Sequence, residues 1–394
     1  MNILLIGNGF DLAHKLPTAY KDFLEFCEKT RYIYTFNDQA SVDEYVEKHL
    51  QNWKMQEPIK EVLRNAFYKR ECNRKYYENR EDDLQVKTPN TALNEIYTHI
   101  KDNVWLDYFL NRYKKMGQNW IDFESEISKV IQALDDARYQ FECGGSLSGV
   151  EKNKVEILLA ILKVSGTTMK TAYGSLDEID HFTGHLNREL ERLIRALEIY
   201  IAEFVRKIEV LYKNPDIEKL NLDHILSFNY SDTYERIYGN GRQMKYDYIH
   251  GRADINKNIL TSNLVLGIDE YLDDARKDKE LEFLTFKKFY QRIYKSTGNT
   301  YLNWLNTIKK NDFQVHNLYI FGHSLDVTDK DILKMFICND NIQTKIFYYR
   351  NDKDDKRELG KLIKNLILMM GQKELIERTG GVNKTIEFIP QTIE

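Results

Sequence analysis

Short apolar runs occur near both ends of the chain, whereas the middle of the chain shows helical periodicity. Residues 3–6 are all apolar and are followed by Gly7-Asn8-Gly9, which predicts a strand buried on both faces, as in a parallel sheet. After Pro17, apolar residues recur at helical spacing up to Phe26. The first 26 residues therefore predict a strand, a glycine turn and a helix.

After Pro215 the chain returns to short runs that are mostly apolar or aromatic. Five of them predict strands, at residues 224–228, 246–250, 263–267, 318–322 and 345–349. Helical patterns near 326–336 and 353–371 separate the later runs. Strands that alternate with helices favour an α/β fold with one mostly parallel sheet.

The middle of the chain predicts long helices, because no proline interrupts residues 90–214. One apolar stripe follows helical spacing in this stretch: Phe123, Ile127, Val130, Ile131 and Leu134. A longer stripe comes close to a heptad repeat: Leu186, Leu190, Leu193, Leu197, Ile201, Phe204, Ile208 and Leu211. This second stripe fits either packing within the chain or self-association, so a homo-oligomer through the helical region is one expectation.

Taken together, these patterns predict one discontinuous α/β domain interrupted by an all-helical insertion. We assign residues 1–39 and 216–394 to the α/β domain and residues 40–215 to the insertion. The 42% of apolar residues describe a folded chain.

The charges nearly cancel, since 57 basic and 61 acidic side chains give a formal charge of −4. This balance gives no general reason to bind nucleic acid or an anionic membrane. One local basic segment contains interleaved Tyr76 and Tyr77: Lys69, Arg70, Arg74, Lys75 and Arg80. Acidic residues lie in and beside it, so it reads as a solvated face, and a nucleic-acid contact is the alternative.

The cysteines and the hydropathy pattern favour a cytoplasmic protein. Cys27, Cys72, Cys143 and Cys338 are too far apart for a zinc knuckle and do not form a disulfide pattern. No metal site is expected. No secretory signal and no apolar stretch near 18 residues is present, so we expect no membrane span.

Two polar loops follow predicted strands, at the edge where parallel sheets bind ligands. In the first, Gly7 and Gly9 allow a tight turn and could bring amides close to phosphate, whereas Asp11 suits hydroxyl contacts or helix capping. In the second, Asn229 offers both a donor and an acceptor, and Asp232 could cap a helix or hold a hydroxyl. Either loop alone could be purely structural.

Two further strand ends carry histidines. His250 precedes Gly251, and Gly322 precedes His323, Ser324 and Asp326. A lone histidine is more often structural than catalytic. Ser324 lacks the second glycine of a nucleophile elbow, which argues against a serine hydrolase. A P-loop motif is also absent from the sequence.

The four loops together resemble the sirtuin motifs in order and approximate spacing. Gly-Asn-Gly-Phe-Asp followed by Leu-Pro-Thr is similar to the sirtuin Gly-Ala-Gly-Ile-Ser and Gly-Ile-Pro. Ser-Phe-Asn resembles Thr-Gln-Asn, His-Gly matches His-Gly, and Gly-His-Ser-Leu-Asp-Val resembles Gly-Thr-Ser-Leu-x-Val. Over nearly the whole chain, these motifs and Trp-Ile-Asp-Phe-Glu at 120–124 resemble the bacterial AbiH family of phage abortive-infection proteins.

The resemblance implies a Rossmann-like, sirtuin-like core that binds NAD. It assigns His250 and Asn229 to catalysis, with His250 acting on ribose hydroxyls or a water. Residues implied to bind the dinucleotide are Gly7, Asn8, Gly9, Phe10, Asp11, Asp232, Gly322, His323, Ser324 and Asp326. The implied chemistry is cleavage of the nicotinamide glycosidic bond, whose transition state builds positive charge on the ribose.

The chain also departs from the sirtuin pattern. Its cysteines cannot supply the four-cysteine zinc module of sirtuin deacetylases, which argues against a protein deacetylase. Ser231 stands where sirtuins have an aspartate, with Asp232 one place later, and Asp329 replaces a usual proline. NAD could therefore be cleaved, or NAD or an ADP-ribosyl ligand could be bound without hydrolysis.

The sequence as a whole predicts an antiphage protein that senses a phage-derived trigger and degrades NAD to arrest the infected cell. Two alternatives stay open. One is a non-hydrolytic nucleotide-binding regulator whose insertion acts on a partner. The other is a nucleic-acid-directed effector that uses the basic segment between Lys69 and Arg80.

Overall fold

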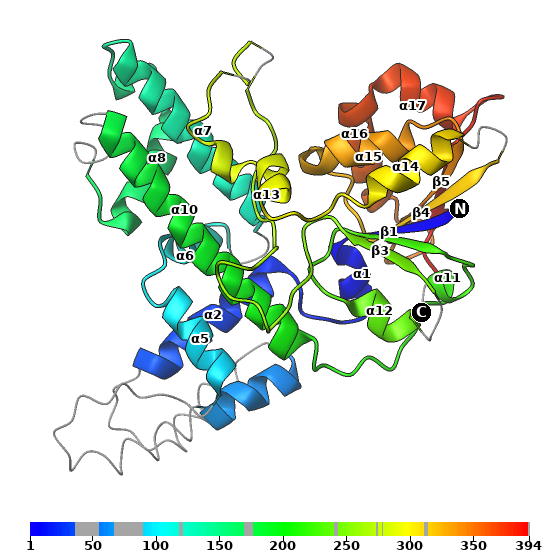
Figure 1. Ribbon diagram of the computed structural model, residues 1–394, viewed down its shortest axis with the longest axis horizontal. Coiled ribbons are helices and arrows are strands. Elements are labelled where there is room, and N and C mark those ends of the chain that lie inside the picture. The colour runs from blue at the N-terminus through cyan, green and yellow to red at the C-terminus, as the bar shows by residue number, and fades with distance from the viewer. Residues whose placement is uncertain are drawn as a thin grey trace.

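The computed structural model of the chain describes residues 1–35, 55–66, 90–117, 121–168, 176–239, 243–272, 275–277, 279–310 and 314–392. Figure 1 shows a sheet with helices on both faces and, beside it, a group of longer helices. The basic segment from Lys69 to Arg80 lies outside the described residues.

Within the described ranges, six parallel strands form the sheet. They are β1 (Asn2–Ile6), β2 (His224–Ser227), β3 (Lys245–Tyr248), β4 (His316–Phe321), β5 (Ile342–Tyr348) and β6 (Ile386–Pro390). Their order across the sheet is β3-β2-β1-β4-β5-β6. Ile3 of β1 is in register with His224 on one side and with Leu318 on the other. The prediction of an α/β fold with a parallel sheet is confirmed.

Alternate residues of β1 face two separate apolar cores, as the twofold periodicity of a strand requires. Ile3 and Leu5 pack into a core made with α14 (Tyr301–Lys310), α15 (Lys330–Ile337), α16 (Arg357–Met370) and α17 (Gln372–Thr379). Leu4 and Ile6 pack into a core made with α1 (Asn8–Ala13), α11 (Pro215–Glu218) and α12 (Thr233–Tyr238). Helices therefore cover both faces, which explains why residues 3–6 of β1 are all apolar.

Between α1 and β2 the described residues form only helices and their connections. Apart from α11, the helices are α2 (Tyr20–Thr35), a helix over residues 57–66, α5 (Thr91–Ile100), α6 (Val104–Lys115), α7 (Phe123–Glu142), η2 (Leu147–Gly149), α8 (Lys152–Ser165), α10 (Leu176–Ile199) and the π-helix η3 (Tyr200–Val205). They share a third core, which also takes in Leu264, Leu266 and Phe286 from the chain after β3. Because α2 packs here, its buried face belongs with the later helices. The domain boundary at residue 39 stays a prediction.

The near-heptad stripe lies along α10 and continues into η3. From Leu186 to Ile208 its members are buried in the helical core, whereas Leu211 is 86% exposed. Packing within the chain therefore accounts for most of the stripe. Self-association through the helical region stays a prediction.

A buried arginine joins the helical group to the sheet part. The Arg195 guanidinium on α10 lies 2.8 Å from Glu198 and donates to the carbonyl of Asp254 at 3.1 Å. Glu198 in turn accepts from the backbone N–H of Asp254 at 3.2 Å. Asp254 follows β3 closely, so α10 fixes the chain directly after the third strand.

The sequence prediction was wrong for the strand at residues 263–267. This segment is buried but pairs with no strand of the sheet. The Gln291 side chain takes the place of a neighbouring strand, because it accepts from the Leu266 N–H at 3.0 Å and donates to the Leu266 carbonyl at 3.1 Å. Leu264 and Leu266 then pack against helices.

Other elements also differ from the prediction. The strand predicted at 246–250 ends at Tyr248, because the N–H of Gly251 turns back to the Tyr248 carbonyl at 3.0 Å. The strand β6 was not predicted, and neither were the helices α13 (Lys288–Tyr294), α14 and α17. The turn η4 (Leu284–Phe286) precedes α13, and η5 (Val327–Asp329) precedes α15.

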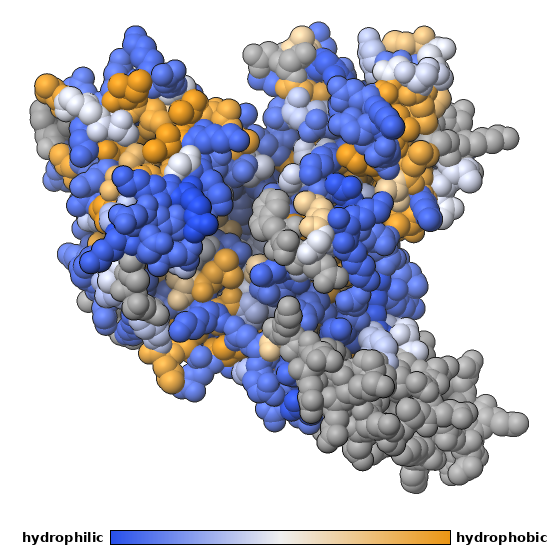
Figure 2. Space-filling view, turned by 180° about the vertical axis from the view of Figure 1, so that it is seen from behind, coloured by the Kyte–Doolittle hydropathy of each residue, from blue (hydrophilic) through white to orange (hydrophobic). Residues whose placement is uncertain are grey.

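The surface in Figure 2 is largely hydrophilic and is interrupted by separate apolar patches. Among the described helices, none is long and apolar enough to cross a membrane.

Candidate functional site

The centre of the sheet is where the connections change face. After β1 the chain enters α1 on one face, and after β4 it reaches α15 on the other. Open parallel sheets bind ligands outside the strand ends at such a point. A cavity of about 510 Å³ lies there, lined by the loops after β1, β2 and β4, by His250, and by α2, α7, α10 and η3.

One side of this cavity, which we call the glycine wall, consists of eight residues from the loops after β1 and β4: Gly7, Asn8, Gly9, Asp11, Gly322, His323, Ser324 and Asp326. The Gly9 N–H donates to the Gly322 carbonyl at 2.7 Å, and the Gly7 N–H donates to the Phe321 carbonyl at 3.3 Å. A Cβ on Gly9 would lie 2.8 Å from the Cα of Gly322. The glycines therefore let two loops touch through their backbones, and the amides of Gly7 and Gly9 are already engaged.

Asp11 is almost fully buried in the glycine wall. The Ser231 hydroxyl donates to Oδ2 of Asp11 at 2.6 Å, whereas Oδ1 of Asp11 has no partner among the described residues. Burial raises the pKa of Asp11 to about 6, although hydrogen bonds from Ser231 and Thr233 act in the opposite direction. Asp11 thus presents a buried acceptor to the cavity and does not cap the helix.

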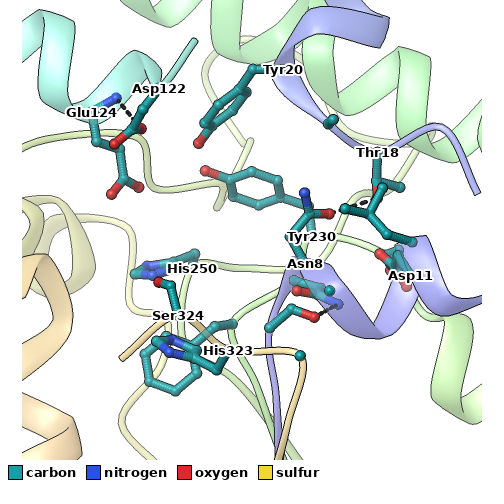
Figure 3. Close-up of a pocket in the computed structure, with 18 of the residues that line it drawn as sticks. Asn8, Asp11, Thr18, Tyr20, Asp122, Glu124, Tyr230, His250, His323 and Ser324 are labelled. Carbon is teal, nitrogen blue, oxygen red and sulfur yellow. Dashed lines mark hydrogen bonds between the residues drawn. The ribbon is translucent and has the colours of Figure 1, made fainter. Parts of the chain in front are cut away.

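Asn8 and Asn229 are fixed by the same loops. The Thr18 hydroxyl donates to Oδ1 of Asn8 at 2.6 Å, as Figure 3 shows. Nδ2 of Asn229 donates to the Gly7 carbonyl at 3.0 Å, so Asn229 holds the start of the glycine wall in place.

The turn after β4 is held by short local hydrogen bonds. The hydroxyl of Ser324 accepts from the Asp326 N–H at 3.3 Å, and Oδ1 of Asp326 accepts from the Thr328 N–H at 3.1 Å. Leu325 is buried and has a φ of 57°, in the left-handed region that residues with a side chain rarely adopt. The turn therefore presents Ser324 and Asp326 to the cavity while Leu325 anchors it in the core.

A second side of the cavity is lined by Glu124, Asp329 and His250, and we call these residues, together with the Lys288 that contacts two of them, the ion-pair wall. Nζ of Lys288 lies 2.6 Å from Oε2 of Glu124 and 2.9 Å from Oδ1 of Asp329. The same Asp329 oxygen lies 3.1 Å from Nε2 of His250. Four side chains from α7, α13, η5 and the chain after β3 thus form one continuous buried chain of contacts.

These contacts fix the tautomer of His250. A carboxylate can only accept, so Nε2 of the neutral ring carries the proton and donates it to Asp329. Nδ1 is then the basic nitrogen, and it is buried without a partner in the described part of the chain. Burial lowers the pKa of His250 to about 4, although Asp329 acts in the opposite direction. The ring is therefore neutral at pH 7.

His323 is held in a similar way. Nδ1 of His323 accepts from the Leu325 N–H at 2.9 Å, so Nε2 carries the proton and faces Oδ2 of Asp329 at 3.6 Å. Phe228 packs edge-on against both His250 and His323, with ring centroids 5.4 and 4.5 Å apart. Asp329 thus lies between two histidines whose orientations are fixed.

Two tyrosines lie between the walls. Tyr20, from the start of α2, stacks on Phe123 with ring centroids 4.2 Å apart. Tyr230 donates from its hydroxyl to the Val265 carbonyl at 2.8 Å. The two hydroxyls point toward each other in Figure 3, near Asp122 and Glu124. Burial raises the pKa of both tyrosines, which keeps them protonated.

The structure brings together all but two of the residues that the sequence assigned to the site. Phe10 lies beneath the glycine wall, in the core with His14, Tyr234 and Phe321. Asp232 does not line the cavity either, because it pairs with Arg206 at 3.1 Å and Arg252 at 2.9 Å. A dinucleotide contact by either residue is not supported by this geometry.

Sequence reasoning missed most of the ion-pair wall. Glu124 belongs to the Trp-Ile-Asp-Phe-Glu motif, of which Trp120 lies outside the described residues. The sequence did contain one indication of this wall, because Asp122 and Glu124 flank the buried Phe123. Acidic side chains next to a buried apolar residue usually have a structural or functional role. Lys288 carried no comparable signal, because lysines are common on helices.

In the described ranges there is no group of three or more His, Cys, Asp or Glu side chains placed to hold a metal ion.

The comparison with known families agrees with the motif resemblance. The family model described as bacteriophage abortive infection AbiH matches residues 3–349, from β1 to just beyond β5. No curated protein and no solved structure matches the chain. The match includes the glycine wall, the ion-pair wall and the helices between them. The chain belongs to the AbiH family of bacteriophage abortive-infection proteins.

Proposed function

We propose that this chain acts in phage abortive infection by binding NAD in the cavity and cleaving its nicotinamide glycosidic bond. The observation that carries the proposal is the position of the cavity. The strand order 3-2-1-4-5-6 is that of the doubly wound Rossmann sheet, and the cavity lies at the β1/β4 switch point where such sheets bind dinucleotides. A volume of about 510 Å³ is in the usual range for small-ligand sites.

The lining suits the cationic end of NAD. Carboxyl groups that can accept hydrogen bonds line it: Asp11, Asp122, Asp326 and Asp329. The nicotinamide ring carries a positive charge in NAD, and the ribose becomes more positive as the glycosidic bond breaks, so nearby acceptors stabilise the transition state. The buried free oxygen of Asp11 suits a ribose hydroxyl.

The pyrophosphate would need donors other than the Gly7 and Gly9 amides, which are engaged between the loops. Thr18, Lys21 and Ser324 line the cavity and carry donors. These side chains, together with the remaining amides of the loop, are the groups that we assign to the phosphates.

His250 is the residue that we assign to proton transfer. Water attacks the ribose carbon, the electron pair of the glycosidic bond leaves with neutral nicotinamide, and Nδ1 of His250 accepts the proton of the water. Asp329 fixes the ring for this role through Nε2. Asn229 faces the same cavity and would accept from a ribose hydroxyl.

The test is nicotinamide release from NAD by the purified chain, with and without phage lysate. We expect His250→Ala to lower the rate at least 100-fold, since general bases contribute about 10²–10⁴-fold. Asn229→Ala should also lower it, and thermal melts should show both variants folded. No release by the wild-type chain under lysate activation, with NAD still bound, would refute cleavage.

A second candidate is NAD binding without hydrolysis. It is favoured by the pKa of about 4 at His250, which makes that ring a weak base at neutral pH. In that case the amount of NAD or ADP-ribose bound per chain stays constant over hours, because the ligand is not hydrolysed. His250→Ala then retains protection against phage.

A further inference from the structure

Glu124 belongs to the helical part of the chain, yet it lines the same cavity as the strand-end loops. It is the second residue of α7, and the N-cap Asp122 accepts from its backbone N–H at 3.1 Å. Its side chain is 13% exposed and its carboxylate lies 2.6 Å from Nζ of Lys288. The start of α7 therefore projects an acid into the site from outside the sheet.

Lys288 is shared between two carboxyl groups, and it is itself 2% exposed. One ammonium can neutralise one carboxylate, so a second negative charge in the same buried space is unfavourable. Asp329 has additional donors in His250 and His323, which makes it the better carrier of the charge. Glu124 is left as the group that keeps its proton.

We propose that Glu124 is a ligand-contacting residue of this site, that its carboxylic acid donates a hydrogen bond to the bound ligand, and that Lys288 positions it against the Asp329–His250 pair. The inference rests on the proposed function, because it names a further residue of the same cavity. It also makes α7 a required part of the site.

The protonation states agree with this assignment. Burial raises the pKa of Glu124 to about 8, with Lys288 acting in the opposite direction. Burial also opposes the charge on Asp329, but Lys288 and His250 hold the pKa of Asp329 well below its usual range. The ionisable groups that face Glu124 come from five segments: Lys288, Asp329, Asp122, Tyr20 and Tyr230. Glu124 is thus a donor at pH 7 and loses that role above about pH 8.

Glutamine is the diagnostic replacement at position 124. Its carbonyl can still accept from Lys288, and its NH₂ group is a donor that does not titrate. Glu126 provides a matched control on the same helix, since it is buried and lies 2.6 Å from Lys129 but does not line the cavity.

The experiment is calorimetric titration of the full chain with a carbocyclic NAD analogue that cannot be cleaved, from pH 6.5 to 9.5. For wild type and for Glu126→Gln we expect the affinity to fall about tenfold as pH rises through about 8, the loss expected for one hydrogen bond. For Glu124→Gln we expect less than a twofold change over the same range. A wild-type affinity that does not change with pH, or an unchanged fall in Glu124→Gln, overturns the inference.

A second readout separates this inference from the NAD proposal. If the wild-type chain does not bind the analogue, the NAD proposal fails, and phage plating then tests Glu124 directly. Glu124→Leu should lose protection as fully as cells that carry an empty vector, and Glu124→Gln should retain it, with both chains folded by thermal melt. Protection by Glu124→Leu at the wild-type level overturns the inference whatever the ligand.

Discussion

The two walls of the cavity are built by different physical means. The glycine wall is fixed by backbone contacts, in which Gly9 and Gly322 touch because neither has a side chain. The ion-pair wall is fixed by side-chain charges, in which Lys288 joins Glu124 to Asp329. The first wall therefore sets the shape of the site, and the second sets its protonation states.

Two aspartates illustrate the difference. Asp11 and Asp329 are both buried in the same cavity, yet the pKa of Asp11 is raised and the pKa of Asp329 is lowered. Burial acts alike on both, but Asp11 receives only hydroxyl donors whereas Asp329 contacts Lys288 and His250. The ammonium of Lys288 beside Asp329 therefore determines that the pKa of this carboxyl group is lowered and not raised.

The largest effect is expected from Gly322→Ala in the glycine wall. A Cβ there would lie 2.1 Å from the backbone nitrogen of Phe10, and the φ of 69° already disfavours a side chain. Backbone atoms cannot move aside cheaply, so we expect the free energy of unfolding to fall by more than about 5 kcal/mol. Urea denaturation measures it.

Gly360→Ala is the matched control, because Gly360 is exposed in α16 and a Cβ there would contact nothing within 4 Å. That change should stabilise the chain by about 0.5–1 kcal/mol, since alanine favours the helix. A Gly322→Ala chain as stable as wild type would mean that the two loops do not touch as described.

The next largest effect is expected from Lys288→Met in the ion-pair wall. Removing the ammonium leaves Glu124 and Asp329 together without a cation, which typically costs about 3–5 kcal/mol for a buried pair. Lys361→Met is the control, because Lys361 lies at the same 2.6 Å from Glu358 but is 70% exposed. It should cost less than about 1 kcal/mol. Equal losses in the two variants would contradict a buried charge on Asp329.

The glycine wall could largely be predicted from the sequence, and the ion-pair wall could not. Gly7, Gly9 and Asp11 follow an apolar strand directly, so local pattern and the rule for strand ends suffice. Glu124, Lys288 and Asp329 are far apart in the chain and meet only when α7 and α13 pack against the sheet edge. No periodic pattern in the sequence indicates that these three side chains come into contact.

The same distinction between local sequence pattern and long-range packing explains where the predicted fold was wrong. Residues 263–267 have the composition of a strand, but Gln291 and Tyr230 supply side-chain hydrogen bonds to Leu266 and Val265 where a neighbouring strand would pair. An apolar run indicates burial and leaves open what it is buried against. The parallel arrangement was predictable because strands such as β1, β2 and β4 contain apolar runs and helical patterns separate the later strands, whereas β6 was not predicted.

The smallest of these effects concerns Asp11 and sharpens the comparison of the two aspartates. Its pKa is raised from 3.8 to about 6 by burial, so the stability that its protonated form contributes is present below pH 3.8 and is lost as pH rises through 6. Asparagine cannot titrate. Between pH 4.5 and pH 7.5, the stability of Asp11→Asn relative to wild type should therefore increase by roughly 2 kcal/mol.

Comparing one variant at two pH values removes any constant cost of placing an amide at position 11. The control is Asp216→Asn, because Lys219 and Thr392 lower the pKa of Asp216 against the opposing effect of burial. A lowered pKa contributes stability that is lost only as pH falls below the usual aspartate range, so this variant should change little between pH 4.5 and pH 7.5. If Asp11→Asn behaves like Asp216→Asn in urea denaturation at both pH values, Asp11 carries a cationic partner, and the distinction between the walls is lost.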